Sequence, residues 1–296
     1  MSASETVFRR LPAAATAAGR ARTRTRRGLD FGFLFGLAVA AAAAAAAAAW
    51  SEAGAAYFLQ PRGAVMVLGG TLGVAILTTP WRRLWRSIGR LLGLLVAEKR
   101  NPQALMEEIL RYARVARFKG LAGIEDAIPS ASHPFLREAL ALALEVENRQ
   151  QLAQVLETRI RVREQEGEAD ARTLEVAGSF APTLGILGTV MGLMDVLKNF
   201  SDLSSVGAGI AMAFVSTMYG LGLANLVLLP AAHRIRARVA EEFDSDAFIL
   251  EGVLCLYDQS HPALARQRLE AYLRGPGRKT RRAALKGDDA AEADLA

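Results

Sequence analysis

The sequence has few of the residue types on which catalytic and metal sites are built. It contains a single cysteine, Cys255, so an internal disulfide framework and a cysteine-rich metal site are both excluded. Its three histidines, His133, His233 and His261, are scattered and do not form the H-E-x-x-H spacing of a zinc protease. A Walker A loop and a G-x-S-x-G nucleophile motif are absent as well. We therefore expect neither an enzyme nor a bound cofactor.

Apolar residues, by contrast, make up 52% of the 296 residues and concentrate in four blocks. Each block is close to the ~20 residues that a helix needs to cross a hydrocarbon core about 30 Å thick. Basic segments lie beside the blocks: "RARTRTRR" precedes the first, "WRRLWRSIGR" follows the second and "HRIRARVAEE" follows the fourth. The net charge of +6 thus fits cytoplasmic flanks of membrane helices better than a nucleic-acid-binding surface. The sequence predicts a multi-pass membrane protein with both termini in the cytoplasm.

The expected fold class is all-α, with four transmembrane helices and a helical cytoplasmic domain inserted between spans 2 and 3. The first span includes ten consecutive alanines at 40–49. Apolar residues at helical spacing in the insert predict amphipathic helices that pack as a compact bundle. The predicted parts are a basic disordered cytoplasmic tail (1–28), a transmembrane hairpin of spans 1 and 2 (29–80), the cytoplasmic helical domain (81–171), spans 3 and 4 (172–230), C-terminal cytoplasmic helices (231–274) and a disordered tail (275–296).

Small residues recur at spacings of three and four along the third span, which places them on one helix face. In lipid, apolar contacts between helices bring no hydrophobic gain, whereas small residues let two backbones approach closely. We therefore expect the third and fourth spans to pack tightly through this face. The predicted helix-packing residues are Gly178, Gly185, Gly188 and Gly192 in the third span and Gly220 in the fourth.

Hydroxyl and proline residues interrupt the same two spans. Thr189 lies in the middle of the third span, and Ser216 and Thr217 lie at comparable depth in the fourth. Each hydroxyl could simply bond the carbonyl four residues earlier in its own helix. Hydroxyls at matched depth on two small-residue helices nevertheless favour an ion pathway or a partner contact. Pro182 and Pro230, near the cytoplasmic ends of these spans, are candidate hinges because proline frees a carbonyl and can kink a helix.

No span contains a deeply placed charge; Asp195 lies near the outer end of the third. Because ion carriers place an ionisable group inside the membrane, an ion pathway here would need a carboxylate from another chain.

The motifs "AGSFAPTLGILGTVMGLMDVL" and "SSVGAGIAMAFVSTMYGLGLANLVLLPAAHRI", after two spans and an insert, closely resemble the flagellar motor stator A subunit (MotA/PomA/MotP type) of the MotA/TolQ/ExbB channel superfamily. The resemblance covers roughly residues 29–274. TolQ- and ExbB-like proteins have one span before their large cytoplasmic region, so two spans here favour the stator.

The resemblance implies a stator subunit in the bacterial inner membrane, in which ion flow generates torque on the rotor. It implies a homo-oligomeric ring, taken as a pentamer, around a MotB/PomB-type B subunit whose single transmembrane helix carries the essential Asp. The rotor switch protein FliG and membrane lipid are the other implied partners, and nucleic acid is not one. An ExbB/TolQ-like proton-channel energiser of envelope transport is the alternative, and a packing scaffold without ion flow is a third.

The resemblance also places rotor-facing charges in the insert, in a pattern similar to "ARFKGLAGIED". Arg117 and Glu125 match this pattern, with Asp126 as a second acid. The position after the arginine is often basic in the family; here it is Phe118, and Lys119 is displaced by one residue. The alternative interpretation is a solvated surface, since exposed charge pairs contribute only ~0–1 kcal/mol to stability. Exposed charges are equally what a rotor could contact.

The transported ion is expected to be Na⁺ or H⁺. Sodium-type stators tend to carry threonine at the position that matches Thr189, and many proton-type stators have alanine there. A hard cation is held by oxygen ligands, and Thr189 and Thr217 offer one hydroxyl oxygen in each span. Related ExbB-like channels carry the threonine and use protons. The sequence therefore favours sodium and leaves the proton open.

Overall fold

The computed structural model of the chain describes residues 27–29, 31–50, 58–94, 96–98 and 101–274. The regular secondary structure in these ranges is helical, except for a short antiparallel strand pair of β1 (Arg27–Leu29) and β2 (Val96–Glu98). Three residues are too few to display a strand periodicity in the sequence, so this pair was not expected. The two tails predicted to be disordered lie outside the described residues, apart from the last two residues of the N-terminal tail, which belong to β1.

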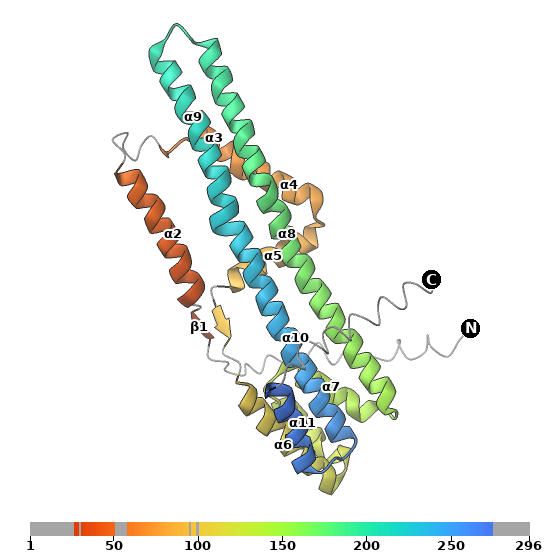
Figure 1. Cartoon of the computed structure of the whole chain (residues 1–296). Helices are drawn as coiled ribbons and strands as arrows, with labels where there is room; N and C mark the ends of the chain where they lie inside the picture. The colour runs from red at the N-terminus through yellow and green to blue at the C-terminus, as the bar shows by residue number, and fades with distance from the viewer. Residues whose placement is uncertain (1–26, 30, 51–57, 95, 99–100, 275–296) are drawn as a thin grey trace, which may run out of the picture.

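Two long helical rods run antiparallel and side by side through most of the molecule (Figure 1). Helix α8 (Arg149–Lys198) is continuous over 50 residues. Helix α9 (Leu203–Gly222), the π-helical turn η5 (Leu223–Leu228) and α10 (Leu229–Tyr257) follow one another without a break. The predicted third and fourth spans are therefore segments of longer helices, because no helix-ending sequence separates their apolar residues from the polar residues beyond.

Side-chain caps mark where the two rods begin. Asn148 accepts a hydrogen bond from the backbone nitrogen of Gln150 at 2.8 Å, and Asp202 accepts one from the backbone nitrogen of Ser204 at 3.1 Å. Hydrogen bonds from the hydroxyls of Ser205 and Ser204 hold the pKa of the Asp202 carboxyl below its usual value. This cap is therefore ionised at neutral pH, where its charge also suits the positive end of the α9 dipole.

The preceding helices lie beside the rods. Helix α2 (Phe31–Ala49) stands to one side and contacts η5 (Figure 1). A single helix packs on α8 and α9 and consists of three consecutive segments, α3 (Pro61–Ala64), the π-helical turn η3 (Val65–Gly69) and α4 (Gly70–Thr78). The next helix, α5 (Trp81–Gly93), begins after Pro80.

Three helices among the described residues are long and apolar enough to cross a membrane. They are Pro61–Thr78, a stretch of α8 and a stretch of the continuous helix Leu203–Tyr257, and they contain the predicted second, third and fourth spans. Helix α2 covers the predicted first span from Phe31 onward and is 19 residues long. By length and composition, the chain is thus organised around helices that suit a bilayer.

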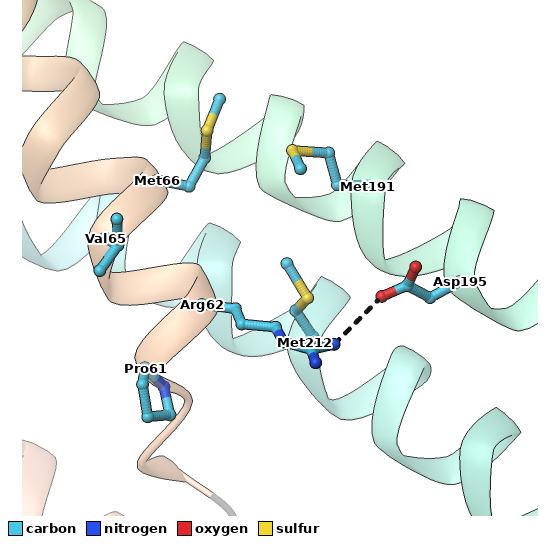
Figure 2. Close-up of a pocket in the computed structure, with 7 residues that line it drawn as sticks. All are labelled: Pro61, Arg62, Val65, Met66, Met191, Asp195 and Met212. Carbon is cyan, nitrogen blue, oxygen red and sulfur yellow. Dashed lines mark ion pairs between the residues drawn. The ribbon is translucent and has the colours of Figure 1, made fainter.

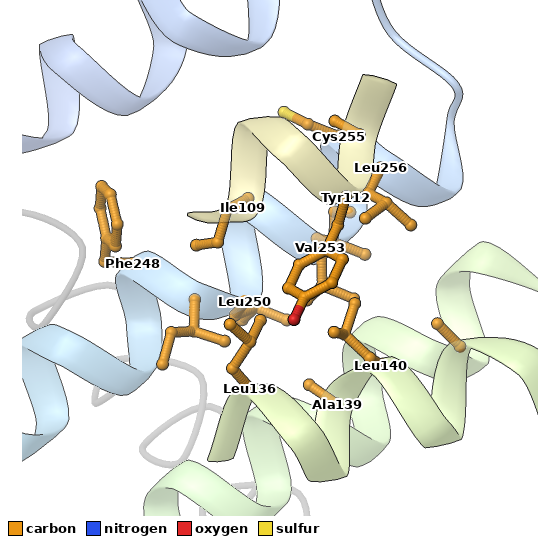
Figure 3. Packing of buried hydrophobic residues seen from close by; sticks show 14 of the residues in the cluster. Ile109, Tyr112, Leu136, Ala139, Leu140, Phe248, Leu250, Val253, Cys255 and Leu256 are labelled. Atoms are coloured by element: carbon orange, nitrogen blue, oxygen red, sulfur yellow. The ribbon is translucent and has the colours of Figure 1, made fainter. Parts of the chain in front are cut away.

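A compact helical domain occupies one end of the rods (Figure 1). Its core forms where amphipathic helices meet, as Figure 3 shows for the buried side chains of Ile109, Leu136, Leu140 and Leu250. Burying a side chain of this size contributes roughly 1.5–3 kcal/mol relative to leaving it exposed. Parts of α8 and α10 belong to the same core, so the domain and the rods share helices. The other helices of the domain are α6 (Pro102–Lys119), the 3₁₀ segment η4 (Leu121–Ser130), α7 (Pro134–Glu145) and α11 (Pro262–Arg274).

A buried ion-pair cluster joins α5 to α8 between the compact domain and the apolar helices. The side chain of Asp170 is 0% exposed, and its carboxylate lies 2.9 Å from the Nε atoms of both Arg86 and Arg90. Arg86 also lies 3.1 Å from Glu166. An unpaired buried carboxylate would cost several kcal/mol. Asp170 therefore requires the two arginines, and this requirement fixes α5 against α8.

Candidate functional site

The predicted packing glycines of α8 lie along its contact with α9. A Cβ atom built on Gly192 would stand 2.7 Å from the carbonyl oxygen of Gly209 and 2.8 Å from the backbone nitrogen of Ala213. A Cβ atom built on Gly185 would stand 3.0 Å from the carbonyl oxygen of Ser216. Contacts this short leave no room for a side chain, so the two helices meet backbone to backbone, as small residues permit in membrane helices.

The same contact continues toward the compact domain. A Cβ atom on Gly220 would stand 2.6 Å from the carbonyl oxygen of Ala181, and Gly178 lies against the start of α10. Gly209 has a comparable position but was not predicted, although its spacing of four from Ala213 was an available signal. We call this contact the α8–α9 seam and define it by its buried glycines, Gly178, Gly185, Gly188, Gly192, Gly209 and Gly220.

Ser216 lies at the point where a third helix joins the seam. Its side chain is fully buried, and its hydroxyl donates to the carbonyl of Met212 at 2.7 Å. A Cβ atom on Gly188 of α8 would stand 2.6 Å from the Ser216 Cβ, and one on Gly63 of α3 would stand 2.5 Å from its Oγ. Sequence analysis did not single out Gly63. The small side chain of Ser216 thus lies between two glycines, and its hydroxyl proton is used in a hydrogen bond within its own helix.

The two threonines meet across the seam. Thr189 Oγ1 and Thr217 Oγ1 are 2.5 Å apart, and Thr189 Oγ1 also lies 3.1 Å from the carbonyl oxygen of Ala213 and 3.2 Å from that of Gly185. A hydroxyl has one proton and two lone pairs, so Thr189 can donate to only one of these oxygens. Both threonine side chains are half-buried. The seam therefore gathers four oxygen atoms at one point without a formal charge.

The two prolines occupy different settings. Pro182 lies inside α8, which continues through it as an α-helix, and its Cα faces Gly220. Pro230 is the second residue of α10, two positions after the last residue of η5. Proline has no N–H to bond the carbonyl of Leu226, and its ring crowds that carbonyl in a regular α-helix, so a wider turn accommodates it. The helix is irregular next to Pro230 and regular at Pro182.

An open pocket of about 560 Å³ lies at the end of the seam that is remote from the compact domain (Figure 2). At this pocket Arg62 pairs with Asp195 at 3.6 Å, and both side chains are largely accessible. An exposed ion pair of this kind contributes only ~0–1 kcal/mol, so Asp195 stays available to solvent. Met66, Met191 and Met212 also line the pocket, and methionine side chains adapt readily to a neighbouring surface.

The charges predicted to face the rotor lie on the compact domain, where α6 ends. Arg117 is in the last turn of α6, and Gly120, with a φ of 75°, turns the chain into η4, which carries Glu125 and Asp126. All three charged side chains are exposed, and within the described part of the chain none of them belongs to an ion pair. Phe118, beside Arg117, is 87% exposed. This surface is therefore accessible to a partner.

A buried carboxylate that sequence analysis missed holds this surface in place. Glu108 of α6 accepts hydrogen bonds from the backbone nitrogen of Ser132, at 2.9 Å, and from the Ser132 hydroxyl. The Tyr112 hydroxyl lies 3.4 Å from both Glu108 Oε1 and the carbonyl oxygen of Ala127. Burial raises the pKa of Tyr112, so it remains a donor. These bonds attach the end of η4 to α6 and support its exposed acids.

The α8–α9 seam predicts that Gly192→Ala destabilises the protein, because the new methyl group would push two backbones apart. Overpacking of this kind costs about 1–3 kcal/mol. The matched control is Gly222→Ala, whose Cβ would meet no atom within 4 Å and which should leave stability unchanged or slightly raised. The measurement is the thermal unfolding of both purified variants in the same detergent. Equal unfolding temperatures would contradict the close backbone contact.

Comparison with known proteins places these features in a family context. The profile of the MotA/TolQ/ExbB proton channel family matches residues 127–245. The motility protein A of Bacillus subtilis (strain 168) is 26% identical over 218 residues, which cover 72% of this chain and 80% of that protein. The motility protein A of Treponema phagedenis is 30% identical over 173 residues, which cover 58% of this chain and 67% of that protein.

A solved structure agrees in fold. A chain of the flagellar MotAB stator complex from Bacillus subtilis superposes with a TM-score of 0.73 at 24% identity, covering 85% of this chain and 98% of that chain. The residues matched by the family profile include all of α8 and α9, and hence the whole of the seam. The sequence similarity to the motility proteins thus agrees with the similarity of fold to a chain of the stator complex. The chain belongs to the MotA/TolQ/ExbB proton channel family, as one of its MotA-type stator subunits.

Proposed function

We propose that the chain is the A subunit of a bacterial flagellar stator, which forms an ion channel with a B subunit and generates torque on the rotor. The observation that carries this function is the chemistry of the α8–α9 seam. It gathers neutral oxygens in mid-span, whereas in the three described spans the charged residues Arg62, Glu175 and Asp195 lie near the ends. A pathway of this kind needs a carboxylate from another chain. The solved structure that matches in fold is, by its title, a MotAB complex.

The proposed partner is a MotB/PomB-type subunit whose single transmembrane helix carries the essential Asp. A pentameric ring of this chain would surround a pair of B subunits. Exposed apolar side chains on both rods, including Ile186 and Val190 of α8 and Phe214 and Met218 of α9, support contacts with other chains and with lipid. The Thr189–Thr217 pair would then orient water or a cation beside the Asp of the partner.

Torque requires the ring to change conformation as ions pass. Pro182 and Pro230 are the proposed hinges. The π-helical turn η5 supports this role for Pro230, because π-helical turns mark positions where a helix can bend and often occur at functional sites. Pro182 faces Gly220 across the seam, so bending at either proline would be transmitted to the other helix.

In the proposed topology α2 is the first of four crossings, and the compact domain and both termini lie in the cytoplasm. The arginines after the second span and after Pro230 support this orientation under the positive-inside rule. The short connection 199–202 between the rods would then be extracytoplasmic. The inner membrane is the expected location.

Cysteine labelling of intact cells checks this orientation. An impermeant maleimide should modify a cysteine introduced at Ser204, near the outer turn, but not one introduced at Gln154 in the compact domain; both positions are exposed. The native Cys255 is buried and gives little background. Permeabilised cells should expose Gln154→Cys as the control. The reverse labelling pattern would show that the chain is inverted.

The rotor contact is proposed at Arg117, Glu125 and Asp126, with FliG as the partner. A strain that lacks the chain should not swim, whereas loss of an ExbB/TolQ-like energiser would leave swimming intact. Charge reversals Arg117→Glu and Glu125→Lys should strongly reduce torque while membrane insertion is retained, because exposed charges orient partners. The measurement is the rotation speed of tethered cells.

The control for these reversals is Glu147→Lys, an exposed acid elsewhere on the compact domain. It should leave rotation close to that of the wild type. Normal rotation of the double variant Arg117→Glu/Glu125→Lys would remove these residues from the rotor contact. Immunoblotting of membrane fractions would show that each variant is present in equal amount.

The ion is proposed to be Na⁺, with H⁺ as the alternative. If Thr189 contributes to a sodium pathway, swimming speed should rise with external Na⁺ at a fixed proton motive force, and Thr189→Ala should weaken this dependence. Thr183→Ala, an exposed threonine on the same helix, is the matched control. Speed that is independent of Na⁺, and lost with a protonophore while a sodium gradient persists, would assign proton coupling instead.

A further inference from the structure

A second pocket, of about 550 Å³, lies between α5, α8 and α10 and is distinct from the seam. Mostly polar atoms line it, among them the side chains of Thr78, Thr79, Arg83, Glu168, Arg172 and Arg236. We call it the interfacial pocket. Its residues come from the end of the second span, from the part of α8 before its apolar stretch, and from α10 just after Pro230. Three elements distant in sequence therefore converge at the boundary between the apolar helices and the compact domain.

Aromatic residues mark this level as a membrane interface. Trp81 and Trp85 lie in the first two turns of α5, are 59% and 57% exposed, and pack edge to face with ring centroids 5.5 Å apart. Tryptophan is enriched where a membrane helix meets the headgroup region. Leu77, which precedes Thr78 at the end of the apolar helix α4, is 86% exposed. The interfacial pocket is thus placed at headgroup depth, with apolar surface on one side.

The charge inside the interfacial pocket is not balanced. Three arginines line it against a single glutamate, Glu168. Glu175 forms two hydrogen bonds with the guanidinium of Arg236 and neutralises it. The guanidinium groups of Arg83 and Arg172 have no partner among the described residues. Two cationic groups from different helices therefore face one polar pocket with their donors unused.

The donors suit a phosphate group. An arginine guanidinium presents a planar fork that binds phosphate oxygens in pairs. The hydroxyl of Thr79 makes no hydrogen bond within the described residues and offers a further donor, whereas Thr78 is bonded to the carbonyl of Val74 at 2.8 Å. Basic pockets between membrane helices on the cytoplasmic side bind anionic headgroups. A phosphodiester carries the negative charge and the acceptor oxygens that would pair with Arg83 and Arg172.

We infer that the interfacial pocket binds the headgroup of an anionic phospholipid, with the phosphate held by Arg83 and Arg172 and an acyl chain lying over Val176 and Leu77. In the proposed topology, this is a lipid of the cytoplasmic leaflet, and only that assignment of leaflet depends on the proposed function. The bound lipid would bridge α5 and α8 at the same joint that Asp170 fixes from inside. It would thereby couple the membrane surface to the base of the rods.

Native mass spectrometry of the purified complex of this chain with its B-type partner tests the inference. The complex is titrated with phosphatidylglycerol and with phosphatidylcholine of the same acyl chains. We expect phosphatidylglycerol to bind more tightly. Arg83→Gln and Arg172→Gln should each weaken its binding about fivefold, and the double variant roughly 25-fold. The matched control is Arg82→Gln, which removes the same charge from a neighbouring exposed arginine that does not line the pocket and should bind as the wild type does.

Four outcomes would overturn the inference. Phosphatidylcholine could bind equally well, or Arg82→Gln could weaken binding as much as the pocket variants do. Inorganic phosphate could displace the lipid at equal concentration, which would indicate a site for free phosphate. The double variant could instead release smaller oligomers with unchanged lipid binding, which would make the arginines a contact between copies of the chain. None of these results bears on whether swimming requires the chain, so the proposed function is tested separately.

Discussion

The close backbone contact of α8 with α9 is the constraint on which the rest of the structure depends. In a bilayer, apolar side chains gain little by leaving lipid for another helix, so association must come from packing at short range and from hydrogen bonds. Gly185 and Gly192 remove the side chains that would hold the helices apart. The Thr189–Thr217 contact adds a hydrogen bond between them. Because both helices continue into the compact domain, their spacing in the membrane also sets the geometry of that domain.

Ion pairs, in addition to packing, hold helix α5 against α8. Asp170 is buried against two arginines of α5, and removal of both arginines would leave its charge without compensation in a site of low dielectric. Arg83, on the same helix, is directed to the interfacial pocket instead. Helix α5 is thus attached to α8 by an internal pair on one side and, as proposed, by a lipid on the other. Such a joint can transmit movement of the membrane helices to the compact domain.

In the proposed ion pathway, the seam would function without a mid-span carboxylate in the three spans among the described residues. Its oxygens are neutral and are already hydrogen-bonded to one another, so it is stable in lipid without an ion or a partner. A titratable group placed there would have to be neutralised or paired at a cost of several kcal/mol. In the proposed complex a second chain supplies the charge, so the ion pathway would be complete only after assembly.

The sequence by itself determined the apolar spans, the small-residue face and the shared depth of the threonines, because helix geometry makes spacings of three and four a local property. It could not reveal that Gly63 meets Ser216, that Asp170 is buried, or that Arg83 and Arg172 share a pocket. These relations join helices far apart in the chain and depend on the distance, rotation and register at which they pack. Only the tertiary structure decides those variables, because close packing selects one arrangement from many that the same helix faces allow.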